Sequence, residues 1–259
     1  MFSKLFKSKK TYEPLDYTLR KYFENNILCL IDFFPEPSLD KRKVFLPSED
    51  DIPIKWNKSK TNVIEALRIV SEAMQINPDE IEMDFYMEGM TELNTGTTPI
   101  FLENPAEEEH TSGLYFDKNE NGKYEISINE INLRNPEALI ATLAHELCHI
   151  KLLGEKKMEE NDEYMTDLAT VFFGFGVFTS NASFQFSQEY DRWAYSTSGY
   201  LNHNEWAYSL ALFAFLRYEE NPAWSEFLNP TIKKEFHRCL RYILENEEEI
   251  FKFKEIEND

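Results

Sequence analysis

Two histidines and a glutamate within five residues have the types and spacing of a metal-dependent hydrolytic site. The stretch is His145-Glu146-Leu147-Cys148-His149, an HExxH pattern. In a helix, residues four apart lie on one face, about 6 Å apart along the axis, so both imidazoles can bind one tetrahedral metal ion. Glu146 lies about 100° further around the helix, within reach of a water molecule on that ion. With only 5 histidines in 259 residues, chance would produce this pattern in about one such chain in a hundred.

The element that must hold these side chains is a helix with a clear start and a clear end. Asn135 can cap the helix, Pro136 suits its first position, and Glu137 favours the helix dipole. Apolar residues then recur with helical spacing, at Leu139, Ile140, Leu143, Leu147, Ile150 and Leu153. The helix is therefore predicted to run to Gly154, a natural C-terminal stop.

A catalytic metal ion needs a third protein ligand besides two imidazoles. Glu163 and Asp167 are four apart in a second predicted helix, 160–178, and so share one of its faces. Because this helix becomes almost wholly apolar, carboxylates carried into it need a cation or hydrogen bonds to offset desolvation. Either one is a candidate ligand, and an acidic first turn favoured by the helix dipole is the alternative interpretation. Gly174 and Gly176 interrupt this helix and are expected to pack closely against the HExxH helix.

Strands are predicted ahead of the HExxH helix. Residues 81–87 alternate apolar and acidic side chains, and residues 114–117 and 123–128 flank an Asn-Gly turn typical of a hairpin. If the strand 123–128 lies at the sheet edge, it could pair with an extended peptide. Residues 88–110 are acidic and rich in Thr, Asn and Pro, and are expected to form a loop. Further helices are predicted at 62–76, 204–218 and 231–246.

The predicted fold class is α+β, with a small antiparallel sheet and its hairpin packed on the HExxH helix and a helical C-terminal half. Only 8 Gly and 11 Pro among 259 residues argue against a turn-rich all-β sandwich. Three parts are predicted. Residues 1–60 form an N-terminal region, residues 61–180 form the catalytic core, and residues 181–259 form a helical C-terminal subdomain packed on the core.

The net charge of −20 makes nucleic acid an unlikely general partner, because phosphate backbones would repel the chain. The longest nearly apolar stretch, 168–178, is about half of what a bilayer-spanning helix requires, so no integral membrane segment is expected. The three cysteines are widely separated and form neither a disulfide framework nor a CxxC metal site. Cys148, inside the HExxH pattern, is expected to be a packing residue. A reducing, cytoplasmic location is therefore expected.

The HExxH helix followed by Glu163 and Asp167 resembles the zincin metallopeptidases, and within them the gluzincin branch typified by thermolysin. The resemblance covers residues 123–178. It implies a Zn²⁺ ion, with Glu163 as its third ligand and Asp167 as a carboxylate that orients a ligand histidine. The 13 residues between His149 and Glu163 form a shorter gap than is usual in thermolysin-like enzymes, and Asp167 is the alternative ligand. The metzincin branch is excluded because Leu and Glu stand at positions 152 and 155, where that branch requires Gly and His.

The function implied is hydrolysis of a peptide or protein substrate by a zinc-activated water, with Glu146 as the general base. Gluzincins also stabilise the oxyanion with a downstream Tyr or His, and His203 is the candidate here, with Tyr195 and Tyr200 as less distinctive ones. An amidase acting on a non-peptide substrate would use the same site. The alternative from another class is a zinc-bound interaction or regulatory protein that binds a protein partner through its C-terminal half, 190–259.

Overall fold

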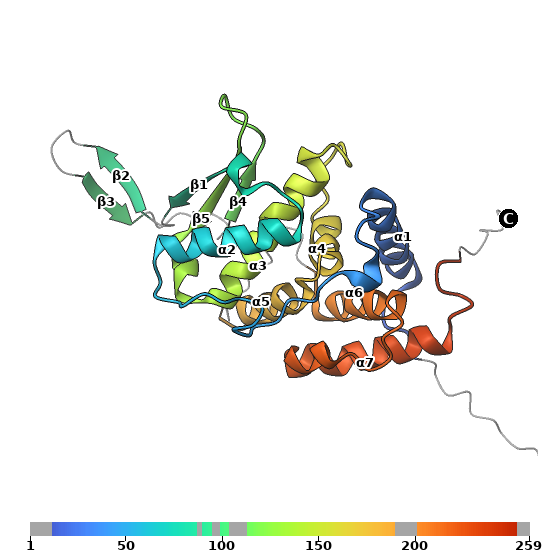
Figure 1. The fold of residues 1–259 in the computed structure, drawn as a ribbon. Coiled ribbons are helices and arrows are strands. Elements are labelled where there is room, and N and C mark those ends of the chain that lie inside the picture. Colours follow the sequence, from blue (N-terminus) through green and yellow to red (C-terminus); the bar gives the residue numbers. More distant parts are fainter. Residues whose placement is uncertain (1–11, 87–89, 95–98, 104–112, 190–200, 253–259) are drawn as a thin grey trace, which may run out of the picture.

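The computed structural model describes residues 12–86, 90–94, 99–103, 113–189 and 201–252. Within these residues the chain is a mixed α+β protein with seven α-helices (Figure 1), which confirms the predicted class. The helices are α1 (Tyr17–Phe33), α2 (Lys60–Ala73), α3 (Pro136–His149), α4 (Glu163–Phe172), α5 (Gly176–Glu189), α6 (His203–Leu216) and α7 (Pro230–Glu245). The strands are β1 (Ile81–Tyr86), β2 (Met90–Asn94), β3 (Pro99–Glu103), β4 (Gly113–Phe116) and β5 (Tyr124–Asn129).

The sheet beside α3 has three strands in the order β1-β5-β4. β4 and β5 form the predicted antiparallel hairpin, but β1 pairs with β5 in parallel. The prediction of a wholly antiparallel sheet is therefore wrong. The physical reason is the connection: residues 87–123 separate β1 from β5, enough chain for the long crossover that parallel pairing needs. Because β5 is the central strand, the condition for pairing a peptide with residues 123–128, a place at the sheet edge, is not met, and β4 forms the edge on that side.

The segment 88–110, expected to be a loop, contains a second hairpin. β2 and β3 pair antiparallel, with Met90 opposite Glu103 and Asn94 opposite Pro99. This hairpin projects from the body of the molecule, to the left in Figure 1. Its acidic, Thr- and Asn-rich composition carries little of the apolar alternation that marks a half-buried strand, which explains why the pattern predicted a loop.

α3 is the central helix of the molecule and packs against α2, α4, α5 and β4. It begins as predicted, with the Asn135 side chain accepting hydrogen bonds from the backbone N–H groups of Glu137 and Ala138. A short π-helical turn, η4 (Ile150–Gly154), continues it, so the helical run ends at the predicted residue. Gly154 is required there for space, since an added Cβ would lie 2.7 Å from the Tyr124 ring. A helix buried on so many sides gives its histidines rigid positions.

The predicted helix 160–178 is two helices, because the chain breaks at Gly174. Gly174 has a φ of +90°, and its carbonyl accepts a hydrogen bond from the Phe45 N–H. The expected packing of the glycines on the HExxH helix is wrong: an added Cβ on Gly174 would lie 2.0 Å from the Lys43 carbonyl oxygen. Gly176 packs instead against Leu210 of α6.

Gly174→Ala is expected to lower the free energy of unfolding by about 3 kcal/mol or more, because left-handed backbone strain and a backbone clash add together. Gly122→Ala is the matched control, since Gly122 has a φ of +73° and nothing within 4 Å of an added Cβ. It should lose only about 1–2 kcal/mol, the cost of the backbone conformation alone. Urea denaturation of both variants measures the difference, and equal losses would contradict the role given to the Lys43 contact.

α1 joins the N-terminal region to the C-terminal half through a buried polar network. Glu24 is fully buried and accepts hydrogen bonds from the Tyr208 hydroxyl (2.7 Å) and the Phe251 N–H (2.9 Å). Lys21 donates to Glu24 and to the Glu249 carbonyl oxygen. One contiguous core runs from residue 15 to residue 250 and includes side chains of all three predicted parts. Their boundaries at 60 and 180 stay a prediction.

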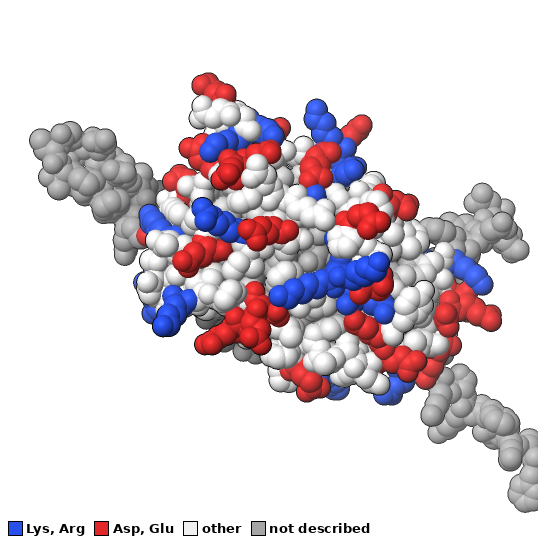
Figure 2. All heavy atoms as spheres, viewed as in Figure 1, with Lys and Arg blue, Asp and Glu red and all other residues white. Residues whose placement is uncertain are grey.

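The surface charge and the apolarity of the helices, over the described residues, bear on whether the chain could bind nucleic acid or cross a membrane. Acidic and basic side chains are interspersed on the face in Figure 2, which shows no continuous basic surface. None of the described helices combines the length and the apolarity needed to cross a bilayer. The three cysteines are free, as predicted. The cytoplasmic location stays a prediction.

Candidate metal centre

Three side chains from α3 and α4 converge on one point. Nε2 of His145 lies 3.0 Å from Oε2 of Glu163, and Nε2 of His149 lies 3.7 Å from the same oxygen. All three candidate ligand atoms lie within 4.8 Å of one another. Tetrahedral coordination with zinc–donor distances near 2.1 Å requires donors about 3.4 Å apart. The donor types and their separations therefore fit a Zn²⁺ ion.

Asp167 contacts the opposite edge of the His145 ring. Its Oδ1 lies 2.9 Å from Nδ1 of His145, and its Oδ2 accepts a hydrogen bond from the Leu201 N–H at 3.1 Å. An ionised carboxylate only accepts hydrogen bonds, so Nδ1 carries the proton, and the lone pair of neutral His145 is then on Nε2. Burial raises the pKa of Asp167, while the hydrogen bonds from His145 and Leu201 oppose that rise. Thus Glu163 faces the two Nε2 atoms and Asp167 orients one ring.

His149 is held by stacking. The ring of Tyr115, on the edge strand β4, lies 5.7 Å from the His149 ring with only 18° between their planes. Nδ1 of His149 is buried and has no hydrogen-bond partner among the residues the structure describes. Burial lowers the pKa of His149 to about 4, so this imidazole is neutral at physiological pH, the form that binds metal. Sequence reasoning missed Tyr115, because nothing in the alternation of its strand singles out one tyrosine.

In the metal-free site a proton occupies the place that a cation would take. Burial lowers the pKa of His145, but its hydrogen bonds with Asp167 and Glu163 outweigh this and raise it well above its ordinary value. Burial raises the pKa of Glu163, but the hydrogen bond with His145 and the charges of both histidines lower it to about 2. Protonated His145 therefore donates from Nδ1 to Asp167 and from Nε2 to Glu163, and a metal ion would displace only the Nε2 proton.

Glu146 lies beside this cluster but is not part of it. Only 5% of the residue is exposed. Burial raises its pKa to about 7, against the opposing charge of His145, and the Glu163 carboxylate adds to the rise. A buried carboxyl group with a pKa near neutrality can both accept and return a proton at physiological pH. Glu146 therefore stays the candidate general base that the sequence predicted.

The structure describes two of the remaining candidates, His203 and Cys148. His203 is the first residue of α6, two residues after Leu201, whose N–H contacts Asp167. The structure thus brings the start of α6 to the site, but His203 is not among the three clustered donors. Tyr195 and Tyr200 lie outside the described residues. Cys148 is fully buried, and burial raises the pKa of its thiol well above its ordinary value, as fits a packing residue.

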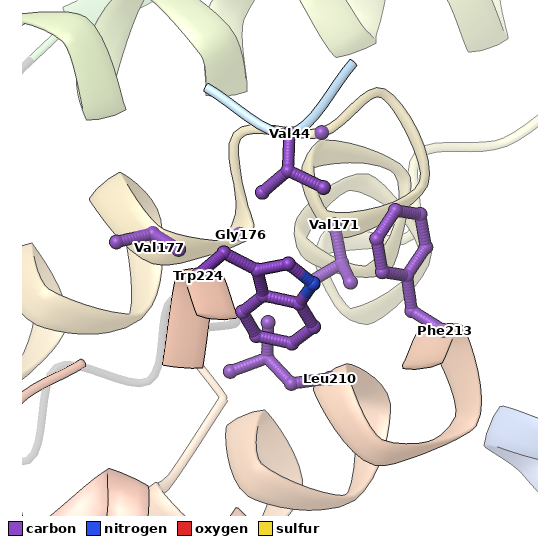
Figure 3. Close-up of a pocket in the computed structure, with 8 residues that line it drawn as sticks. Val44, Val171, Gly176, Val177, Leu210, Phe213 and Trp224 are labelled. Carbon is purple, nitrogen blue, oxygen red and sulfur yellow. The ribbon is translucent and has the colours of Figure 1, made fainter. Parts of the chain in front are cut away.

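A small apolar void lies elsewhere, where the α4–α5 junction meets α6 (Figure 3). It has no room for a water molecule. Its lining consists of Val44, Val171, Gly174, Gly176, Val177, Leu210, Phe213 and Trp224. None of these side chains ionises or binds metal, so the void is a packing defect of the core and not a second site.

Comparison of the chain with protein-family models, with curated proteins and with solved structures finds no match. The functional argument therefore depends on the side chains themselves.

Proposed function

We propose that this chain is a zinc-dependent hydrolase that cleaves peptide bonds. His145, His149 and Glu163 are the proposed zinc ligands, and Glu146 is the proposed general base. The observation that carries the proposal is the convergence of two Nε2 atoms and one carboxylate oxygen at 3.0 and 3.7 Å, with Asp167 on the far side of the first ring. The resemblance of this arrangement to gluzincin metallopeptidases supports it.

The residues present divide the proposed reaction among them. A bound Zn²⁺ would acidify a water molecule and polarise the substrate carbonyl. The Glu146 carboxylate takes a proton from the attacking water as the carbon–oxygen bond forms, and gives that proton to the leaving amine as the carbon–nitrogen bond breaks. Asp167 keeps His145 in the tautomer that presents Nε2. His203 is retained as the candidate for oxyanion stabilisation.

The substrate is proposed to approach along β4. This strand packs against α3, and its outer edge has no partner strand among the described residues. An extended peptide can add to such an edge through main-chain hydrogen bonds. The ring of Tyr115, which stacks on His149, belongs to this strand and so joins it to a proposed ligand.

Three protein donors favour catalysis over a purely structural zinc site. A structural site is normally closed by four protein ligands, whereas a catalytic one leaves a position for water. Among the described residues the cluster contains only His145, His149 and Glu163. A zinc-bound interaction or regulatory protein would be expected to close its site with a fourth protein ligand, so this function is the second hypothesis.

We expect the purified protein to contain about one zinc per chain and to cleave fluorophore-labelled casein, with 1,10-phenanthroline stopping cleavage and added zinc restoring it. Metal analysis and the fluorescence assay test the two halves separately. Protein without zinc after reconstitution would overturn the metal site. Full zinc without cleavage of casein or of a mixed peptide library would overturn the peptidase and favour the regulatory protein.

A further inference from the structure

The proposed ligand Glu163 depends for its position on the helix turn that carries it. It is the first residue of α4, and 32% of its side chain is exposed. Apart from the two histidines, its side chain accepts a hydrogen bond only from Asn161 among the described residues, at 2.7 Å. His145 and His149, in contrast, project from a helix packed on several sides. Whatever fixes the first turn of α4 therefore fixes the third donor.

The residue before Glu163 is tied to α1. Asp162 is the N-cap of α4, and its Oδ1 accepts a hydrogen bond from the Met165 N–H. Its other oxygen, Oδ2, accepts a hydrogen bond from the Tyr22 hydroxyl at 2.6 Å. This distance is typical of a charge-assisted hydrogen bond between a hydroxyl and a carboxylate. One carboxylate thus caps α4 and joins it to α1.

The residue after Glu163 is also held by α1. The Tyr164 ring packs edge-on against Tyr22, at 6.1 Å between centroids, and lies 6.4 Å from the Phe23 ring. Such aromatic pairs stabilise beyond the area they bury. Both neighbours of Glu163 along the chain therefore contact α1, which otherwise contributes nothing to the cluster of donors.

We propose that Tyr22 is a positioning residue for the metal centre, acting through its hydrogen bond to Asp162 to hold Glu163 at its distance from the two imidazoles. This inference rests on the proposed function. The Tyr22 hydroxyl touches neither donor nor substrate. It sets the distance between α1 and the start of α4, and metal sites lose affinity when a ligand departs by about 0.5 Å from its place.

The test compares two tyrosine-to-phenylalanine changes that each remove one hydroxyl from one carboxylate. Tyr22→Phe removes the bond to Asp162, and Tyr12→Phe removes the 3.0 Å bond from Tyr12 to Glu235 on α7. Both tyrosines are half-buried. Zinc affinity is measured by competition with a chromophoric chelator, and the stability of the metal-free protein by thermal denaturation.

We expect Tyr22→Phe to raise the zinc dissociation constant about tenfold, the lower end of the loss that follows when a group hydrogen-bonded directly to a metal ligand is removed, because Tyr22 acts through Asp162. It should also change the visible absorption of the cobalt-loaded protein, which reports ligand geometry. Tyr12→Phe should leave both readouts at the wild-type value. Both variants should lower the melting temperature of the metal-free protein by a similar amount, about 2–4 °C. In an Asp162→Ala background, Tyr22→Phe should have no further effect on zinc affinity.

Equal zinc affinity in wild type and Tyr22→Phe would overturn the inference. Equal weakening of zinc affinity by Tyr22→Phe and Tyr12→Phe would also overturn it, because it would indicate that any lost hydroxyl destabilises the fold around the site. A further tenfold loss in the Asp162→Ala background would also overturn it. Failure of the wild type to bind zinc or cobalt would overturn the metal centre and this inference together, a result that the wild-type titration alone distinguishes from the others.

Discussion

Replacing Glu146 with glutamine is expected to lower kcat/KM for casein or peptide cleavage by about 10³, while zinc content stays at the wild-type level. Proton transfer by a positioned side chain contributes about 10²–10⁴ to rate, and an amide cannot accept the proton of the attacking water. Glu146 is not among the three donors of the cluster, so zinc should be retained. Steady-state kinetics and metal analysis on the same preparation measure both quantities.

Glu137→Gln is the matched control for this variant, since Glu137 lies in the first turn of the same helix and away from the cluster. It should keep wild-type kcat/KM. The neutral glutamine should not unfold the protein, because burial already disfavours the ionised form of Glu146. A Glu146→Gln variant that cleaves as fast as wild type would remove the general base from the mechanism.

The helix that carries the candidate site could be predicted in detail because local signals agree with its tertiary surroundings. Asn135, Pro136 and the apolar spacing up to Leu153 each predict the same element, and the structure has α3 and η4 over that range. The face shared by His145 and His149 follows from the helix geometry alone. Nothing beyond the local chain was needed to predict this half of the cluster.

α1 could not be predicted, and the reason lies in its buried face. Arg20, Lys21 and Glu24 are all buried there. Glu24 pairs with Lys21 and Arg20 and accepts a hydrogen bond from Tyr208 of α6. Periodicity detects helices by apolar residues on the inner face, so a face on which charged side chains alternate with Phe23, Ile27 and Leu30 gives a weaker signal. The same helix supplies Tyr22, and its contact with Asp162, 140 positions further along the chain, was equally invisible to local analysis.

Strand direction and the break in the second helix depend on contacts distant in sequence. Alternation predicted β1 and β5, but whether they run parallel is decided by the crossover between them. Gly174 was noted as an interruption, and only its contact with the Lys43 carbonyl explains why the helix ends there. Likewise, the spacing of Glu163 and Asp167 left two candidate ligands, because spacing does not say which edge of the imidazole each carboxylate faces.

Glu163→Ala is expected to reduce bound zinc far below one equivalent, whereas Asp167→Ala should retain zinc at saturating metal and weaken its affinity by about 10–100-fold. The difference follows from the ring edges: Glu163 approaches Nε2 of both histidines, and Asp167 contacts only Nδ1 of His145. Metal analysis after dialysis at fixed free zinc measures the zinc bound by both variants. The control is Glu160→Ala, which removes an exposed carboxylate three residues before Glu163 and should bind zinc like wild type. Thermal denaturation in the presence of a chelator separates lost affinity from lost folding, which matters most for Asp167 because it is buried and also accepts the Leu201 N–H. If Glu163→Ala kept full zinc and Asp167→Ala lost it, the two carboxylates would exchange roles, and the ligand would be the residue that now orients the ring.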